Sequence, residues 1–329
     1  MAYRRAQCRH RRRYHAGRLS TARQPFAAGR TLMARIVGGL GIAHTPSMGI
    51  EYDRGMRDGF DPRWQRWFDG TRPVHRWLAE LRPSQIIVVY NDHLNHFDFR
   101  AYPTLAIGIG GSFPQADEGW GPRPFPELPG DPRWGLHLAE FLVREEDFDL
   151  TLCQELAVDH GIYSWLPYVM DLPWSVPITP IAVNMIRQPL PTSRRLCQLG
   201  IALRRAVTAF DSDERVLIVA TGGMSHQISG ARFGIANEDF DRYFLRTLPQ
   251  GLKELAAIPQ EDYMRYGGTD SVELVLWFAM RAALSHEAQP AYTFQTFPQI
   301  TGCGVLAMAE PDAAIAHPAR ETPGSRPIA

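Results

Sequence analysis

The sequence predicts a single α/β domain of three layers, α/β/α, in which helices cover both faces of a mixed central sheet. The chain has 329 residues, and its 45% hydrophobic content is enough to bury a large core. Short apolar runs of the buried-strand type alternate with longer stretches of helical periodicity. Three of these apolar runs lead into a histidine. Because ligands of open α/β sheets bind beyond the carboxyl ends of strands, this pattern predicts a site at that edge.

The alternation can be followed along the chain from Met33. We expect a helix over 64–81, broken before Pro73, because a proline inside a helix removes a backbone hydrogen bond. The Gly- and Pro-rich loop over 113–131 is long, and its Trp120 favours a functional role over disorder. The other expected elements are strands over 35–43, 85–90, 104–109, 149–153, 178–183, 214–220 and 305–309, and helices over 133–145, 193–210, 238–247 and 269–283.

The two ends of the chain depart from this pattern. Residues 1–32 are rich in arginine and lack apolar periodicity, so we expect them to be disordered. A basic nucleic-acid arm or an organelle presequence would have this composition. Translation from a misassigned upstream start is the favoured explanation, because Met33 stands directly before the first strand. We therefore expect the catalytic domain over 33–310 and a loose tail over 311–329.

Composition argues against several functional classes. The formal net charge of zero provides no global field that would attract nucleic acid or a membrane surface. Lys253 is the only lysine, which excludes a Walker-type phosphate loop and argues against a Schiff-base mechanism. The four cysteines form no C-x-x-C pair, so neither a zinc knuckle nor a disulfide framework is indicated. No apolar stretch approaches the roughly 20 residues of a membrane span, and we expect a cytoplasmic protein.

Two histidines follow strands at the start of the domain. His44 precedes Pro46, whose rigid turn suits a metal ligand, and His93 follows an Asn-Asp pair that can bond a neighbouring ligand. Either histidine alone would more often be a structural cap. Glu273 lies early in an apolar helix, where an unpaired carboxylate would be costly, so it needs a metal ion or an arginine such as Arg281. Two histidines and one carboxylate suit non-haem Fe(II) oxygenases, although zinc hydrolases use similar ligands.

The third strand-end histidine lies in a different setting. His226 follows two glycines, which allow the backbone to approach a ligand closely and favour an acid/base role over metal ligation. His160 follows an aspartate at a tight turn and is expected either to contact substrate or oxygen or to be structural. Ser225 stands beside His226, but the chain has no G-x-S-x-G motif, so a serine hydrolase is disfavoured.

An ordered series of motifs resembles the class III extradiol ring-cleavage dioxygenases, most closely the β (catalytic) subunit of protocatechuate 4,5-dioxygenase. The resemblance extends from Met33 to about Glu310. The motifs that carry it are His44-Thr45-Pro46, Tyr90-Asn91-Asp92-His93, Asp117-Glu118-Gly119-Trp120-Gly121-Pro122-Arg123-Pro124, Asp159-His160-Gly161, Thr221-Gly222-Gly223-Met224-Ser225-His226-Gln227 and Val272-Glu273-Leu274-Val275.

The resemblance implies a set of roles. His44, His93 and Glu273 would ligate Fe(II), His226 would be the acid/base residue, and His160 would line the site. The implied reaction is the opening of a catecholic aromatic acid beside its diol by O2, which gives a semialdehyde acid. Substrates implied by this resemblance include protocatechuate and gallate.

The sequence also departs from the protocatechuate enzymes. Near the end of the domain, Thr301 stands where those enzymes resemble one another in a Ser-containing stretch. Thr301 and Thr45 are more similar to gallate and 3-O-methylgallate dioxygenases, which are longer chains with a fused α-type domain. We therefore expect a separate small α subunit, in an oligomer, or a substrate whose pocket needs no lid. Arg123 is a further candidate for facing an acidic substrate.

Two alternative hypotheses are also consistent with the sequence. The first is a zinc-dependent relative that opens the ring of a catechol derived from an aromatic amine. The second is a non-catalytic binding protein on the same fold, against which the presence of a base beside the expected ligands argues.

Overall fold

The computed structural model describes residues 33–313, so the expectations for 1–32 and for most of the tail lie outside the described residues. Eight strands form the main sheet, and two short strands form a separate pair. The bounds are β1 (Arg35–Ile42), β2 (Gln85–Tyr90), β3 (Leu105–Gly108), β4 (Ser112–Phe113), β5 (Leu128–Pro129), β6 (Thr151–Cys153), β7 (Ile178–Val183), β8 (Arg215–Thr221), β9 (Gln289–Thr296) and β10 (Cys303–Ala309).

The main sheet has the order β6-β3-β7-β2-β8-β1-β10-β9. Its centre is parallel, because β8 pairs in parallel with both β1 and β2, and β2 pairs in parallel with β7. The edges are mixed, since β10 and β3 run antiparallel to their inner neighbours β1 and β7. The carboxyl ends of β1, β8 and β2 therefore meet at one edge of the sheet, side by side.

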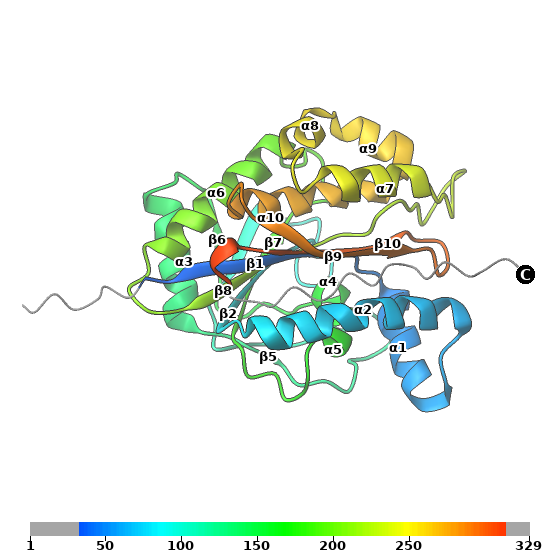
Figure 1. Ribbon diagram of the computed structural model, residues 1–329, viewed down its shortest axis with the longest axis horizontal. Helices are drawn as coiled ribbons and strands as arrows, with labels where there is room; N and C mark the ends of the chain where they lie inside the picture. Colours follow the sequence, from blue (N-terminus) through cyan, green and yellow to red (C-terminus); the bar gives the residue numbers. More distant parts are fainter. Residues whose placement is uncertain (1–32, 314–329) are drawn as a thin grey trace, which may run out of the picture. The chain divides into compact units, whose positions relative to one another are not determined.

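Helices cover both faces of this sheet, which confirms the predicted three-layer α/β/α class (Figure 1). One face is covered by α3 (Pro132–Arg144), α6 (Ser193–Thr208), α7 (Glu238–Thr247), α8 (Leu252–Ala257), α9 (Gln260–Gly267) and α10 (Trp277–Ala283). The other face is covered by α1 (Pro46–Asp58), α2 (Pro62–Leu81), α4 (His160–Tyr163) and α5 (Leu166–Val169). Two short 3₁₀ helices complete the described chain, η1 (Thr269–Leu276) and η2 (Pro311–Ala313).

The two faces of the sheet bury separate apolar cores. Strand β2 shows why, since Ile87 and Val89 pack into the core under α6 and α10, and Ile86 and Val88 pack into the core under α2. Successive side chains of a strand point to opposite faces, so a wholly apolar strand such as β2 belongs in the middle of a covered sheet. All six residues of β2 are buried.

Two helical predictions were wrong in detail. The expected break before Pro73 does not occur, because α2 continues through it with Trp67, Val74 and Trp77 buried on one side. Pro73 removes the backbone donor for the carbonyl of Asp69, and Tyr292 donates a hydrogen bond to the adjacent carbonyl of Gly70 (2.7 Å). The single helix expected over 269–283 is divided into η1 and α10.

Other elements were not predicted. Helix α1 begins directly at Pro46, where we expected only a rigid turn, although proline is favoured in the first turn of a helix. Strand β9 was also missed, because its alternation of residues is only weakly apolar.

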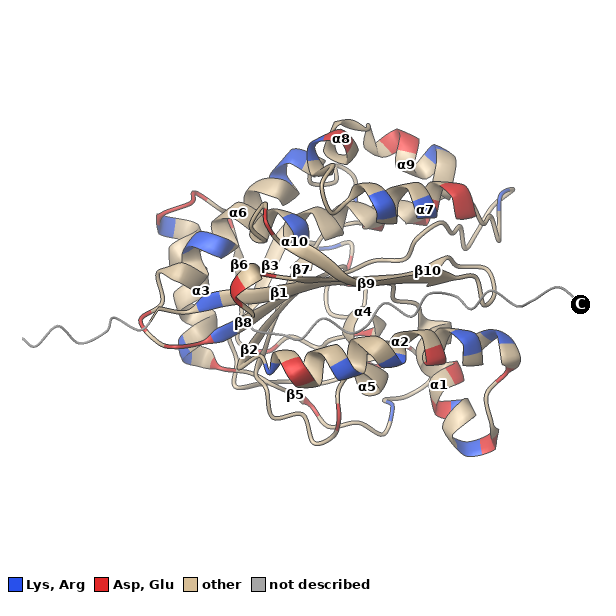
Figure 2. Ribbon diagram, in the orientation of Figure 1, with Lys and Arg blue, Asp and Glu red and all other residues tan. Residues whose placement is uncertain are grey.

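Charged residues are found mainly in the helices and loops rather than in the strands (Figure 2). Positive and negative residues are interspersed on helices of both faces, as expected for a chain of zero net charge (Figure 2). Within residues 33–313, no helix combines the length and hydrophobicity that a bilayer span requires.

Candidate active site

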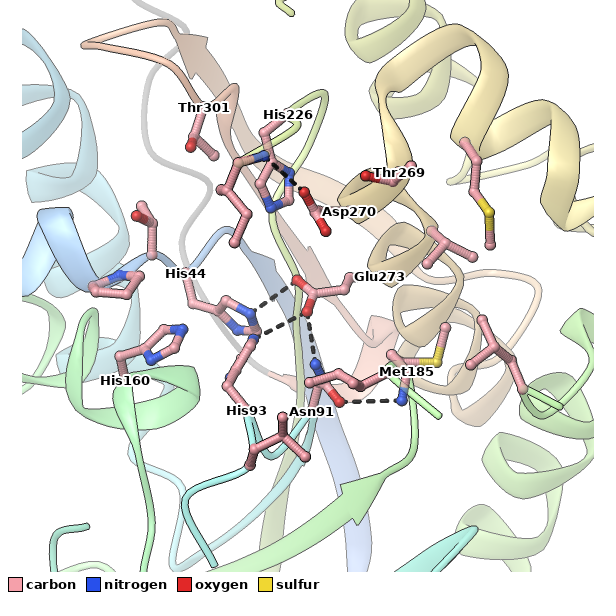
Figure 3. Close-up of a pocket in the computed structure, with 18 of the residues that line it drawn as sticks. His44, Asn91, His93, His160, Met185, His226, Thr269, Asp270, Glu273 and Thr301 are labelled. Carbon is pink, nitrogen blue, oxygen red and sulfur yellow. Dashed lines mark hydrogen bonds and ion pairs between the residues drawn. The ribbon is translucent and has the colours of Figure 1, made fainter. Parts of the chain in front are cut away.

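The carboxyl ends of the three central strands carry the predicted histidines into one cavity. His44 follows β1 and His93 follows β2, while the loop after β8, which lies between these strands, carries His226. All three side chains line the same cavity, together with His160 and Glu273 (Figure 3). The structure thus brings together residues that are far apart in sequence.

Glu273 lies between His44 and His93. Its Oε2 is 3.0 Å from Nε2 of His44, and its Oε1 is 3.0 Å from Nε2 of His93. Asn91 donates a hydrogen bond to Oε1 (2.8 Å), and the backbone N–H of Gly223 donates to Oε2 (3.2 Å). The carboxylate is therefore buried but well supplied with partners, which is the condition for keeping a charge in the interior.

The Nδ1 atom of each histidine has its own partner. Nδ1 of His44 is 2.8 Å from the hydroxyl oxygen of Thr221, and Nδ1 of His93 donates to Oδ2 of Asp159 (2.9 Å). Asp159 also accepts from the backbone N–H of His93 (2.7 Å), so one carboxylate holds both the ring and the backbone of this residue. These contacts direct both Nε2 atoms toward Glu273, as the outer partners of metal-bound imidazoles do.

The electrostatics of this cluster favour an ionised carboxylate. Burial alone would raise the pKa of the Glu273 carboxyl, but His44 and His93 outweigh burial and hold the pKa well below its usual range. Burial lowers the pKa of His44 despite its contact with Glu273. Burial would also lower the pKa of His93, but the carboxylates of Asp159 and Glu273 raise it well above the ordinary value. A cation bound here would replace the proton that these carboxylates hold on His93.

The spacing of the donor atoms fits a metal ion. Two ligand atoms of one ion, each about 2.1 Å from it and about 90° apart, are about 3.0 Å from each other. That is the separation of Glu273 from both Nε2 atoms. Nitrogen atoms of His44, His93 and His160 also lie within 4.8 Å of one another, so His160 is near enough to be considered as a further ligand. Glu273 completes the tighter set, because it is 3.0 Å from both histidines.

His226 occupies a different part of the cavity wall. Its Nδ1 donates to the carbonyl of Met224 (2.8 Å), and because a carbonyl can only accept, Nδ1 carries the proton. The other ring nitrogen, Nε2, is not used in this bond. A Cβ at position 223 would lie 2.5 Å from Cε1 of His226, so glycine is required there for the ring to fold back. The loop thus holds the ring through Nδ1 and leaves Nε2 as the nitrogen that faces the cavity.

The cavity has a volume of about 560 Å³, within the usual range for small-molecule sites. Thr45 and Thr301 both line it, and Thr301 pairs with His226 as an isolated β-bridge. The cavity also has an apolar lining, formed by Leu94, Met185, Ile186, Leu190, Ile228, Met264 and Val272. The cavity therefore combines histidines and carboxylates with apolar side chains that suit an aromatic ring.

Two arginines considered from the sequence are engaged elsewhere. Arg123 does not line this cavity, because its guanidinium pairs with Asp53 (2.7 and 2.8 Å) and with the carbonyl of Tyr163. Arg281 does not pair with Glu273 and instead donates to the carbonyls of Pro249 (2.7 Å) and Ser285 (3.0 Å). The plain salt bridge considered for Glu273 is therefore not formed.

Sequence reasoning missed two carboxylates that support the site. Glu118 contacts His160, and Asp241 holds the backbone of Ser225, next to His226. Glu118 lay within a motif already noted, but its partner is 42 residues away. Asp241 had a usable signal, because it occupies the buried stripe of α7 with Phe244 and Leu245, at positions i, i+3 and i+4.

Known proteins give a consistent picture. The profile of a family described as the catalytic LigB subunit of aromatic ring-opening dioxygenase matches residues 38–304. The chain is 35% identical over 208 residues to a gallate dioxygenase of Pseudomonas putida, which is 63% of this chain but only 61% of that relative's length. It is 27% identical over 295 residues to a 2,3-dihydroxyphenylpropionate/2,3-dihydroxicinnamic acid 1,2-dioxygenase of Klebsiella pneumoniae, covering 74% of this chain and 88% of the relative.

A solved structure supports the fold alone. An uncharacterized protein of Escherichia coli K12 superposes with a TM-score of 0.52 at 18% identity, covering 83% of this chain and 99% of that one.

Proposed function

Because the chain belongs to the family of catalytic LigB subunits of aromatic ring-opening dioxygenases, we propose that it catalyses extradiol cleavage of a catechol by O2. The observation that carries the proposal is the placement of His44, His93 and Glu273 beside His226 in one cavity. In this reaction the ring C–C bond adjacent to the diol breaks and both oxygen atoms of O2 enter the product, a ring-opened oxo acid.

We propose Fe(II) as the cofactor, held by Nε2 of His44, Nε2 of His93 and the carboxylate of Glu273. Two imidazoles and one carboxylate with open positions are the ligand set of non-haem Fe(II) oxygenases. When bound, Fe(II) would supply the redox chemistry that couples the catechol to O2. The protein fixes the ligands through Thr221, Asp159 and Asn91, which is how outer contacts tune such sites.

The proton chemistry falls to His226. Its Nε2 accepts a proton from a catechol hydroxyl and later donates a proton to an oxygen atom of the opened ring. Nδ1 does not take part, because it donates to the carbonyl of Met224. His160 lines the opposite part of the cavity. The hydroxyls of Thr45 and Thr301 can bond polar substituents of the ring, and Met185 packs against its apolar face. These residues orient the ring and exclude water.

The substrate that we propose is a catecholic aromatic acid such as protocatechuate or gallate. Hydroxyl groups at positions 45 and 301 support this choice by offering donors to a carboxylate. Because the matching family is described as a catalytic subunit, we further propose that a separate small α subunit covers the site within an oligomer.

The test uses the full chain, purified without oxygen and loaded with Fe(II) or Zn(II). Protocatechuate, gallate, 3-O-methylgallate and 2,3-dihydroxyphenylpropionate are offered while oxygen uptake and the ring-opened product are followed, the product of protocatechuate being a yellow semialdehyde. Glu273→Gln is expected to abolish iron retention. His226→Phe is expected to keep iron and lower turnover by roughly 10²-fold or more.

Three outcomes would contradict this assignment. If the iron-loaded protein turned over none of these catechols, the proposed reaction would be wrong. Turnover supported by zinc would reject Fe(II) as the required metal, and loss of iron from His226→Phe would show that His226 is a ligand.

A further inference from the structure

The loop before β5 runs alongside the segment that leads to His160. The backbone N–H of Ala116 donates to the carbonyl of Val158 (2.9 Å), and the N–H of Val158 donates to the carbonyl of Pro114 (2.8 Å). Gln115 and Val158 thereby form an isolated parallel bridge. The two segments run parallel from this bridge, so Glu118, three residues after Gln115, lies beside His160, two residues after Val158.

Glu118 makes two contacts with His160. Its Oε1 accepts the backbone N–H of His160 (2.9 Å), and its Oε2 accepts Nδ1–H of the ring (2.5 Å). The side chains are 8% and 10% exposed, so water screens the pair little. With the carboxylate oxygen as acceptor, Nδ1 is the donor of this bond and carries a proton. The remaining nitrogen, Nε2, is then available to the cavity, and Figure 3 shows a ring nitrogen of His160 directed toward His44.

The loop that carries Glu118 is fixed on both sides. Asp117 Oδ1 accepts the N–H groups of Gly119 (2.9 Å) and Gly121 (3.1 Å), and both glycines have the positive φ that this tight turn requires. Two residues later, Arg123 forms a two-pronged ion pair with Asp53 of α1 and also donates to a carbonyl of α4. This arrangement holds the Glu118 carboxylate in place without any contribution from a substrate.

We propose that Glu118 is a positioning residue of the active site, which holds His160 as the Nδ1–H tautomer so that Nε2 accepts a hydrogen bond from the bound catechol. This inference rests on the proposed function. It gives Arg123 the role of anchoring the loop instead of binding substrate. It also separates His160 from the ligand set, because the pair acts on the substrate and leaves metal binding to His44, His93 and Glu273.

The first test compares Glu118→Gln with the matched variant Glu127→Gln. Glu127 lies on the same loop and accepts a hydrogen bond from Ser112 at the surface (2.6 Å). A glutamine at 118 can still accept the backbone N–H of His160 through its oxygen, but it then offers an N–H to Nδ1 and reverses the tautomer. We expect Glu118→Gln to lower kcat about 10- to 100-fold with iron affinity and Tm unchanged. Glu127→Gln should remain within about twofold of the wild type, as surface changes usually do.

A double-mutant cycle shows whether Glu118 acts through His160. In a His160→Ala background, Glu118→Gln should cause no further loss of kcat. An equal loss in both backgrounds would overturn the proposal, since it would show a structural effect of the loop. A parallel loss of iron affinity in Glu118→Gln and His160→Ala would also overturn it, because His160 would then be a ligand.

A second readout does not depend on turnover. With ¹⁵N-labelled histidine in the zinc-loaded protein, the Nδ1 of His160 should resonate as protonated in the wild type and as unprotonated in Glu118→Gln, with His160→Ala providing the assignment. The same tautomer in both proteins would overturn the proposal. If the wild type opened no catechol but showed this tautomer change, the proposed function would fail while the Glu118–His160 contact stood.

Discussion

Asp241 gives a prediction whose size can be worked out from the structure. Its carboxyl group is fully buried in α7 and accepts hydrogen bonds from the N–H (2.9 Å) and the hydroxyl (2.7 Å) of Ser225. Burial raises the pKa of this carboxyl from 3.8 to about 7, and the nearby charge of Glu238 adds to the rise while the bonds from Ser225 oppose it. The buried thiol of Cys303 is the other titratable group that interacts with Asp241.

The sign follows from the direction of the pKa shift. A carboxyl whose pKa is raised in the folded state prefers to be protonated there, so its ionisation destabilises the fold as pH rises. The cost begins near the unfolded pKa of about 3.9, grows by about 1.4 kcal/mol per pH unit and levels off above the folded pKa. A shift of about three units therefore corresponds to a loss of about 4 kcal/mol in the free energy of unfolding between pH 4 and pH 7.

The assay is urea unfolding of the metal-free full chain between pH 4 and pH 8, comparing the wild type with Asp241→Asn. The variant cannot ionise at this position, so its stability relative to the wild type should rise by about 4 kcal/mol over this range and stay constant above pH 7. Asp239→Asn, on the exposed side of the same helix, is the matched control and should show no such trend. A pH-independent difference between Asp241→Asn and the wild type would refute the reasoning.

Two further predictions concern the cavity itself. Asp270 is a carboxylate that lines it, and its Oδ2 already accepts the N–H of Ile228 (2.9 Å), so Asp270→Asn should raise kcat/KM for anionic catechols about tenfold relative to 4-methylcatechol. Equal effects on both substrates would show that Asp270 does not face the ring substituent. A Cβ at Gly222 would lie 2.6 Å from the carbonyl oxygen of Glu273, so Gly222→Ala should destabilise the protein by about 1–3 kcal/mol and weaken metal binding. Wild-type urea unfolding and metal titration curves for Gly222→Ala would contradict this close approach.

The sequence was most informative where local chemistry determines structure. The β-branched runs of β2 and β8 were predicted nearly to their ends, because a short continuous run of β-branched residues is typical of a strand buried on both faces. Helix α1 was not predicted, since a proline after a strand indicates a turn and a helix start equally well. The division of η1 from α10 was also unpredictable from periodicity, because a 3₁₀ helix and an α-helix place apolar residues on similar stripes.

The candidate site was partly predictable for a related reason. His44 and His93 each follow the carboxyl end of a predicted strand, and these ends lie at one edge of a parallel sheet, so the two side chains could be expected to lie close together. Their outer partners could not, because the contacts of His44 with Thr221 and of His93 with Asp159 join residues separated by 177 and 66 positions. Such pairs depend on the strand order, and one sequence does not reveal that β8 lies between β1 and β2.

The roles that we propose for the strand-end histidines differ for a reason that only the structure supplies. In sequence, His44, His93 and His226 all follow apolar strands, and in the structure the Nδ1 atom of each has an oxygen partner. What separates them is the other nitrogen. Nε2 of His44 and of His93 each lie 3.0 Å from the same carboxylate of Glu273, which makes these two rings a pair suited to one cation. His226 is held instead by a neutral carbonyl on its own loop, which is why we propose the acid/base role for this ring and the metal-binding role for the other two.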